Sequence, residues 1–224
     1  MGTQNLHEIE AANMSSTSPA TTFEKNVFIN CPFDDEYRSL LQPLLFSLIY
    51  LGFIPRIASE RSNAGEQRID KIYDLIGESK YGIHDLSRLK AVKVNEYYRL
   101  NMPLELGLDL GSRRFAGGRF KEKKLLILST SKYEYSKAVS DLSGVDIKAH
   151  DDEAVKIVRA VRNWLKEFVS DSLPAPTVIW EQFNYFISDF NSTRTAEGFS
   201  ADDIYEMPAH EFIDFITEWM GART

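Results

Sequence analysis

Short apolar runs alternate along the chain with longer segments whose apolar residues recur at helical spacing. The short runs are candidate strands and cover residues 27–30, 53–58, 80–84, 124–129 and 145–149. The longer segments are candidate helices and cover residues 35–51, 63–78, 103–115 and 154–169. This alternation is typical of a parallel sheet with helices on both faces. We therefore expect an α/β fold with a doubly wound, mostly parallel, five-stranded sheet.

The candidate helix at 103–115 carries an acidic residue near its start. Pro103 suits the first helical position, because its missing N–H costs nothing there. This start puts Glu105 in the first turn. Five residues after the proline have the apolar spacing of a half-buried helix: Leu104, Leu108 and Phe115, with Leu106 and Leu110. An acidic side chain at a helix start is favoured by the helix dipole by about 1 kcal/mol or less. Glu105 therefore has a structural interpretation beside any functional one.

The last part of the chain differs from the alternating part. Residues 172–176 form a linker-like break, and two amphipathic segments follow at 178–190 and 208–220. Their aromatic residues are too numerous for a solvated tail: Phe183, Phe186, Phe190, Phe212, Phe215 and Trp219. We expect a flexible leader at 1–22, a domain at 23–171 and a helical extension at 172–224. The extension either packs on the domain or docks a partner, including a second copy of the chain.

Charge and composition narrow the function. The chain has 224 residues and a net charge of −7, and residues 171–224 hold ten acidic and only two basic side chains. A nearly neutral main body with an acidic end argues against general duplex nucleic-acid binding but allows a small anionic ligand. The single cysteine, Cys31, excludes an internal disulfide and a multi-thiolate zinc site.

Other cofactor and membrane signals are weak. The four histidines lack metal-ligand spacing, and the sequence has no glycine-rich phosphate loop, so we expect neither a metal nor a cofactor. The longest apolar run, 44–54, is about half a membrane span. No secretory signal precedes residue 26, and a cytoplasmic protein that does not enter a membrane is the expectation.

In open α/β sheets, ligands bind beyond the carboxyl ends of the strands where the strand order reverses. In the common order 2-1-3-4-5, that point lies between the first and third strands. The residues just past those two strand ends are Asn30, Cys31, Phe33, His84, Asp85 and Ser87. Glu105 begins the helix after the third strand, so we expect it to face the same crevice.

Three stretches also carry a family resemblance: FINCPF at 28–33, IHDL at 83–86 and PLELGL at 103–108. Together they resemble the nucleoside 2-deoxyribosyltransferase family, in which a glutamate that opens a helix as E-L-G is the nucleophile. The chain is also similar to TIR domains that hydrolyse NAD on a related flavodoxin-like sheet. The resemblance spans about residues 26–170. It implies that Glu105 is a nucleophile or cation stabiliser and that Asp85 contacts the leaving base.

The chemistry expected of such a site is cleavage of an N-glycosidic bond, in which a carboxylate stabilises an oxocarbenium-like sugar and a second acid assists the departing base. Glu105 and Asp85 supply the two carboxylates, although an aspartate at a strand end often caps a turn. Arg68 could hold a phosphate or be a solvated surface residue. A thiol–imidazole pair of Cys31 and His84 is a further alternative.

The sequence thus favours an N-glycosidase that acts on a nucleoside, a nucleotide or NAD, with Glu105 and Asp85 as its catalytic residues. The resemblance implies a bacterial toxin or an antiphage, that is antiviral, effector as the setting. Hydrolysis and transfer both remain open. Two alternatives are a sensor that binds a nucleotide without chemistry and an adaptor that self-associates through the C-terminal helices.

Overall fold

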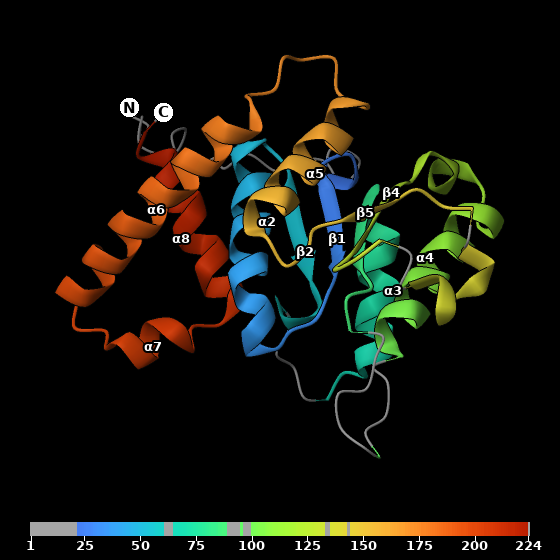
Figure 1. Ribbon diagram of the computed structural model, residues 1–224, viewed down its shortest axis with the longest axis horizontal. Coiled ribbons are helices and arrows are strands. Elements are labelled where there is room, and N and C mark those ends of the chain that lie inside the picture. The colour runs from blue at the N-terminus through green and yellow to red at the C-terminus, as the bar shows by residue number, and fades with distance from the viewer. Residues whose placement is uncertain are drawn as a thin grey trace, which may run out of the picture.

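The computed structural model describes residues 22–60, 65–88, 95, 100–132, 135–142 and 144–223. Nearly all of the expected leader, residues 1–21, lies outside the described residues. The described chain forms one parallel sheet in the order β2-β1-β3-β4-β5 (Figure 1). Its strands are β1 (Asn26–Asn30), β2 (Ile54–Ile57), β3 (Tyr81–Asp85), β4 (Lys124–Ser129) and β5 (Ile147–Ala149). The predicted flavodoxin-like α/β fold is therefore confirmed, including the adjacency of the first and third strands.

Strands β1 and β3 are buried along their whole lengths, as expected for central strands of a sheet that is covered on both faces. They pair in parallel register, with Asn30 opposite His84. Alternate side chains serve opposite faces: Val27 and Ile29 belong to one apolar cluster, whereas Phe28 belongs to another. Both faces of the sheet consequently need a helical layer.

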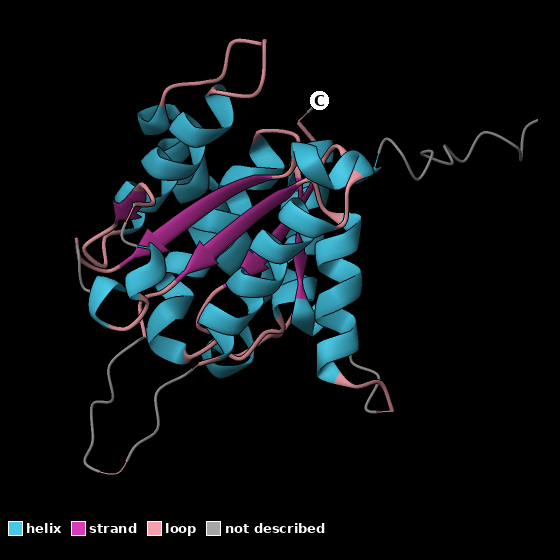
Figure 2. Cartoon of the chain, turned by 90° about the vertical axis from the view of Figure 1, so that its right-hand side faces the viewer, coloured by secondary structure: helices cyan, strands magenta, loops and turns pink. Residues whose placement is uncertain are grey.

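Helices α2 (Arg38–Tyr50) and α5 (Ala154–Lys166) cover one face, and α3 (Arg68–Glu78) and α4 (Asn101–Phe115) cover the other (Figure 2). Short 3-10 turns occupy Asp35–Tyr37, Ala58–Glu60, Gly118–Glu122, Tyr135–Lys137 and Ser140–Leu142. The first of these turns replaces the beginning of the helix expected at 35–51.

The buried face of α4 differs from the predicted one. The helix begins at Asn101, so Glu105 is its fifth residue rather than part of its first turn. Leu106 is buried and Leu108 and Leu110 are half-buried, as expected. Leu104 is 54% exposed and Phe115 is 85% exposed, so the prediction was wrong at these two positions. The buried positions are Met102, Glu105, Leu106 and Asp109, which recur at helical spacing. This helix therefore presents two carboxylates to the interior.

The C-terminal extension comprises α6 (Pro176–Ala196), α7 (Ala201–Tyr205) and α8 (Ala209–Gly221). Its aromatic side chains join the same core cluster as α2. The Phe46 ring of α2 is fully buried and lies 5.5 Å from Phe186 and 5.9 Å from Trp219, measured between ring centroids. Of the two alternatives for the extension, the structure therefore shows packing on the domain.

No helix in the described part of the chain is long and apolar enough to cross a membrane.

Candidate functional site

A cleft of about 390 Å³ opens beyond the carboxyl end of β1, between the 3-10 turn that follows β2 and the beginnings of α3 and α4. Five residues that the sequence pointed to line it: Asn30, Cys31, Phe33, Arg68 and Glu105. The other lining residues are Pro32, Ser59, Asn101 and Met102. Sequence reasoning did not assign Ser59, Asn101 or Met102, which come from the ends of β2 and the start of α4.

Glu105 is a carboxylate with little compensation for its burial. The residue is only 6% exposed, and its Oε1 lies 3.6 Å from Nη2 of Arg68. The side chain of Arg68 is itself 57% exposed, so water weakens this pairing. Burial raises the pKa of Glu105, while electrostatic interactions with Arg68 and His84 act in the opposite direction. A carboxylate in this state gains much from any positive charge that enters the cleft.

Asn30 connects the floor of the cleft to the beginning of α4. Its side-chain Nδ2 donates a hydrogen bond to the Met102 carbonyl over 2.8 Å and lies 3.0 Å from Nδ1 of His84. Because Nδ1 accepts from Asn30, the ring proton of neutral His84 belongs on Nε2, which lies 3.1 Å from Oδ2 of Asp109. His84 is fully buried, so it supports the cleft without lining it.

Both ring nitrogens of His84 are engaged, one by Asn30 and the other by Asp109. The imidazole therefore has no nitrogen free for the thiol–imidazole pair with Cys31. Cys31 does line the cleft, and burial together with the charges of Asp85 and Glu105 raises the pKa of its thiol well above the usual value. A neutral thiol is a weak nucleophile, so the pairing of Cys31 with His84 has no support in this arrangement.

Asp109 lies one turn beyond Glu105 and is fully enclosed. Its Oδ1 is 3.1 Å from Nζ of Lys123, which also donates hydrogen bonds to the backbone carbonyls of Ile76 and Ser79. Burial alone would raise the pKa of Asp109, but the hydrogen bond from His84 and the charge of Lys123 lower it. Asp109 is thus a satisfied carboxylate that ties α4 to the interior.

Gly82 on β3 makes this close approach possible. A Cβ atom at that position would lie 2.5 Å from Oδ2 of Asp109 and 3.0 Å from Nε2 of His84. Any larger residue would therefore displace the side chains of Asp109 and His84 from their present contact.

Asp85 occupies a different environment from Glu105. It is fully buried and accepts hydrogen bonds from the Tyr37 hydroxyl at 2.6 Å and from the Ser87 backbone N–H at 2.8 Å, and also from the Ser87 hydroxyl. Nε2 of His150 lies 3.1 Å from its Oδ2. Burial acts to raise the pKa of Asp85, but the hydrogen bonds, above all that from His150, lower it overall.

The ring of His150 is oriented by the backbone. Its Nδ1 accepts from the N–H of Asp152 over 3.1 Å, so its proton sits on Nε2, where it faces Asp85 and the hydroxyl of Ser87. Neither Asp85 nor Ser87 lines the cleft. The two therefore belong to a buried anchor, and the predicted role of Asp85 at the leaving base stays a prediction without support from this geometry. Sequence reasoning missed Tyr37 and His150, although His150 directly follows the fifth predicted strand.

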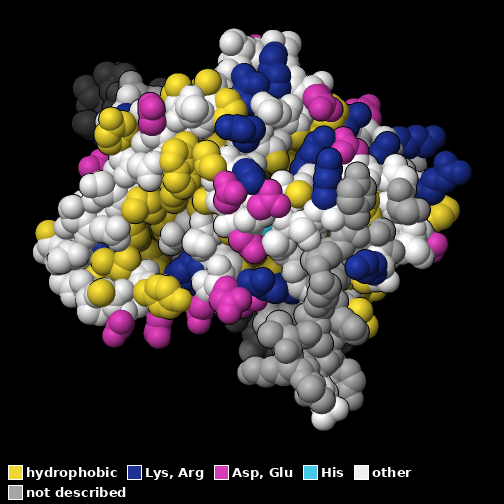
Figure 3. All heavy atoms as spheres, in the orientation of Figure 1, with side chains coloured by type: hydrophobic (Ala, Val, Ile, Leu, Met, Phe, Trp, Pro, Cys, Tyr) yellow, Lys and Arg dark blue, Asp and Glu magenta, His cyan; other side chains and the backbone are white. Residues whose placement is uncertain are grey.

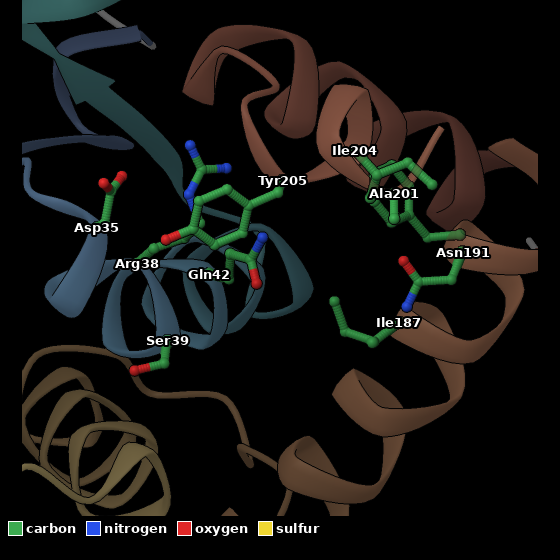
Figure 4. Close-up of a pocket in the computed structure, with 10 residues that line it drawn as sticks. Asp35, Arg38, Ser39, Gln42, Ile187, Asn191, Ala201, Ile204 and Tyr205 are labelled. Carbon is green, nitrogen blue, oxygen red and sulfur yellow. The ribbon is translucent and has the colours of Figure 1, made fainter. Parts of the chain in front are cut away.

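The extension reaches the rim of the cleft. A neighbouring hollow of about 220 Å³ shares Phe33 and Ser59 with the cleft and is walled by Glu206, Met207 and Pro208. A further hollow of about 340 Å³ lies between α2 and the α6 and α7 helices (Figure 4). There the guanidinium of Arg38 stacks 5.0 Å from the centre of the Tyr205 ring and donates to the Met207 carbonyl. These contacts fasten the extension beside the cleft.

Among the described residues, no group of three or more His, Cys, Asp or Glu side chains is placed to hold a metal ion. Compared with family models, with curated proteins and with solved structures, the chain gives no match. The residues of the cleft themselves must therefore carry the functional conclusion.

Proposed function

We propose that this protein is an N-glycosidase that cleaves the bond between base and sugar in a nucleoside, a nucleotide or NAD. The observation that carries the proposal is Glu105, a buried and weakly compensated carboxylate in the cleft beyond the carboxyl end of β1. Carboxylates with perturbed pKa values in clefts are frequent at catalytic sites. The location agrees with the general position of ligand sites in open α/β sheets.

The chemistry follows from the charge that develops on the sugar. As the bond from C1′ to the base nitrogen breaks, its electron pair leaves with the base and C1′ becomes cationic. The Glu105 carboxylate stabilises that cation more strongly than it stabilises the neutral sugar, because it is poorly hydrated where it stands. Water then attacks C1′, and its proton passes to Glu105.

Leaving-group assistance distinguishes the substrates. Among the described residues that line the cleft, Glu105 is the single carboxylate. Cys31 holds its proton tightly, and Asp85 lies in the buried anchor. A base that departs as a neutral molecule without being protonated suits this lining best. A pyridinium N-glycoside such as NAD is therefore favoured over a neutral purine nucleoside.

Binding groups flank Glu105 on both sides. Phe33 is 42% exposed, so its ring is open to stack against a planar base. The exposed guanidinium of Arg68 can pair with a phosphate in the two-pronged manner typical of arginine. Asn30 orients the beginning of α4 and so fixes the position of Glu105 relative to these groups. The resemblance to nucleoside 2-deoxyribosyltransferases and TIR domains implies the same role for Glu105 and suggests a toxin or antiphage effector as the biological setting.

The test is release of free base. The protein is incubated separately with NAD, nicotinamide mononucleotide and neutral nucleosides, and the products are separated by chromatography. Wild type should release nicotinamide, and Glu105→Gln should lower that rate by about a hundredfold or more because the lost interaction acts mainly in the transition state.

Asp70→Asn is the matched control, since it removes the same charge from an exposed position of α3, the helix that carries Arg68. This variant should release base at the wild-type rate. Equal rates for Glu105→Gln and wild type would refute the catalytic assignment.

A nucleotide sensor is the second candidate, because the exposed Phe33 and Arg68 can bind a nucleotide without any chemistry. The same incubation separates the two functions when it is combined with calorimetric binding. Tight NAD binding without any released base in wild type would favour the sensor.

A further inference from the structure

The far end of α4 carries a second group of binding residues. Arg113, Arg114 and Lys121 line a hollow of about 400 Å³ together with Leu110. The two arginines lie in the last turn of α4, and Lys121 lies in the 3-10 turn that follows. This hollow shares no lining residue with the cleft at Glu105. Arg113 follows Glu105 by eight positions, which corresponds to about 12 Å along a helix.

The positive charge of this hollow is not balanced by neighbouring acids. Among the described residues, none of Arg113, Arg114 and Lys121 forms an ion pair within 4.0 Å. The nearby Asp109 is paired with Lys123, and Glu122 lies 3.8 Å from Lys80. Figure 3 shows Lys and Arg side chains gathered on the side of the molecule where α4 lies.

The negative end of the α4 dipole neutralises only part of the positive charge of the hollow. The C-terminal end of a helix supplies about half of a unit negative charge, whereas three full cations meet at the end of α4. The remainder is available to an anion from solution. Arginine forks match phosphate oxygens in number and spacing, and lysine adds a point charge. A phosphate group therefore fits the hollow.

An exposed aromatic residue ends the helix that carries the two arginines. Phe115 is 85% exposed and directly follows Arg114. Its ring lies over Gly111, where an added Cβ atom would be 3.9 Å from it. An exposed aromatic ring at the same helix end as a group of cations is the combination that stacks bases and holds phosphates in single-strand binding proteins.

We propose that this end of α4 is a second nucleotide site, in which Arg113, Arg114 and Lys121 bind phosphate and Phe115 stacks the base. A free nucleotide and a nucleotide within a single strand share this chemistry. The site does not depend on cleavage at Glu105, because the two sets of residues are separate.

The experiment measures binding of adenosine triphosphate and of inorganic tripolyphosphate by calorimetry, and binding of an oligothymidylate of about 12 nucleotides by fluorescence anisotropy. The double variant Arg113→Gln/Arg114→Gln should weaken adenosine triphosphate binding roughly tenfold. Phe115→Ala should weaken it by a similar factor but leave tripolyphosphate binding unchanged, because tripolyphosphate has no ring to stack. Lys121 lies outside α4, so Lys121→Gln should weaken the binding of both ligands without disturbing the end of the helix. This variant therefore distinguishes the loss of a binding group from an unfolded helix end.

Two controls keep the outcome decisive. Lys148→Gln/Arg159→Gln removes the same charge from exposed positions of β5 and α5 that do not line the hollow, and it should bind as wild type does. Arg68→Gln should also leave this site intact.

The proposal is overturned if wild type binds none of these ligands. It is overturned equally if both double variants weaken binding to the same extent, or if Arg68→Gln abolishes binding while Arg113→Gln/Arg114→Gln does not. Stronger binding of the oligonucleotide than of adenosine triphosphate, with the same variants affected, would support the site. It would also identify the ligand as a single-stranded nucleic acid rather than a free nucleotide.

Discussion

The buried face of α4 carries two carboxylates one turn apart, and their surroundings are opposite. Asp109 is enclosed between His84 and Lys123, and these partners lower its pKa. Glu105 borders the cleft with the exposed Arg68 as its ion-pair partner, and burial raises its pKa. The two side chains belong to the same helix face, so secondary structure does not explain the difference. Their hydrogen-bond partners do.

This contrast separates a structural carboxylate from a candidate catalytic one. A buried carboxylate stabilises a fold when donors replace its water, and it destabilises the fold when they do not. Asp85 belongs with Asp109, since Tyr37, Ser87 and His150 surround it. Glu105 is the exception, and such exceptions tend to persist where function requires them.

The largest expected effect is a loss of stability on replacing Asp109, the enclosed carboxylate of the pair. Asp109→Asn would leave Lys123 buried without its carboxylate, which should destabilise the fold by about 3–5 kcal/mol. Urea denaturation monitored by circular dichroism measures the change. Replacing both partners, as Asp109→Leu with Lys123→Met, should recover part of the loss. If Asp109→Asn unfolds at the wild-type midpoint, the two carboxylates are not as different as their surroundings imply.

The second effect is a loss of activity on replacing Glu105, the carboxylate that borders the cleft. Glu105→Asp keeps the charge but withdraws it by one methylene, and a misplacement of about 1 Å can cost a hundredfold in rate. We expect base release to fall by about that factor while the urea midpoint stays near that of wild type. Full activity of Glu105→Asp would show that the position of the charge is unimportant and would weaken the catalytic interpretation.

Gly82 offers a way to disturb both carboxylates through the backbone. Gly82→Ala places a methyl group against Asp109 and His84, and overpacking of this kind typically costs about 1–3 kcal/mol. His84 lies beside Asn30, which holds the beginning of α4, so base release should fall as well. Gly77→Ala on α3 is the matched control, since no atom lies within 4 Å of its added Cβ. Equal melting of Gly82→Ala and Gly77→Ala would contradict the close packing of α4 on β3.

The smallest effect is the pH dependence of stability. The folded-state pKa of Glu105 is raised above its ordinary value of 4.5, so the folded protein binds a proton more readily than the unfolded chain. Its favourable contribution is complete below pH 4.5 and is lost as the pH rises through the folded pKa. At neutral pH, the free energy of unfolding of Glu105→Gln should therefore exceed that of wild type by about 1 kcal/mol or less. Thermal melting measured at several pH values should show this difference shrinking in acid.

The pKa values of Asp85 and Asp109 predict the opposite trend. Both are lowered from the ordinary value of 3.8, so their contribution is present above that pH and is lost as the pH falls through the folded values. Thermal melting of Asp109→Asn and wild type should accordingly converge in strong acid. Convergence at neutral pH instead would indicate that the pairing with Lys123 contributes little.

The sheet could be predicted from the sequence because strand residues alternate between two buried faces and strand ends follow from the pattern. Strand order predicted that Asn30, Phe33 and Glu105 face one crevice, and all three line the cleft, whereas His84, Asp85 and Ser87 from the end of β3 do not. The burial of Asp109 could not be predicted from the sequence. It depends on Lys123, and a lysine is normally expected at a solvated surface. The spacing of four residues between Glu105 and Asp109 was the one available signal.

The separation of Asp85 from the cleft could not be predicted for a similar reason. It depends on Tyr37 and His150, which come from the turn before α2 and from the end of β5. Strand order places Asp85 at the correct edge of the sheet, but side-chain partners decide whether it faces the cleft or the interior.

The aromatic contact between α2 and the extension has a consequence for folding during synthesis. Phe46 becomes fully buried only when Phe183, Phe186 and Trp219 are present. At typical translation rates, the outer face of α2 therefore stays exposed for on the order of ten seconds or more, until the C-terminal extension has been synthesised. During that interval the nascent chain exposes a row of apolar side chains that chaperones recognise, and a ribosome stalled before residue 183 would hold an aggregation-prone intermediate.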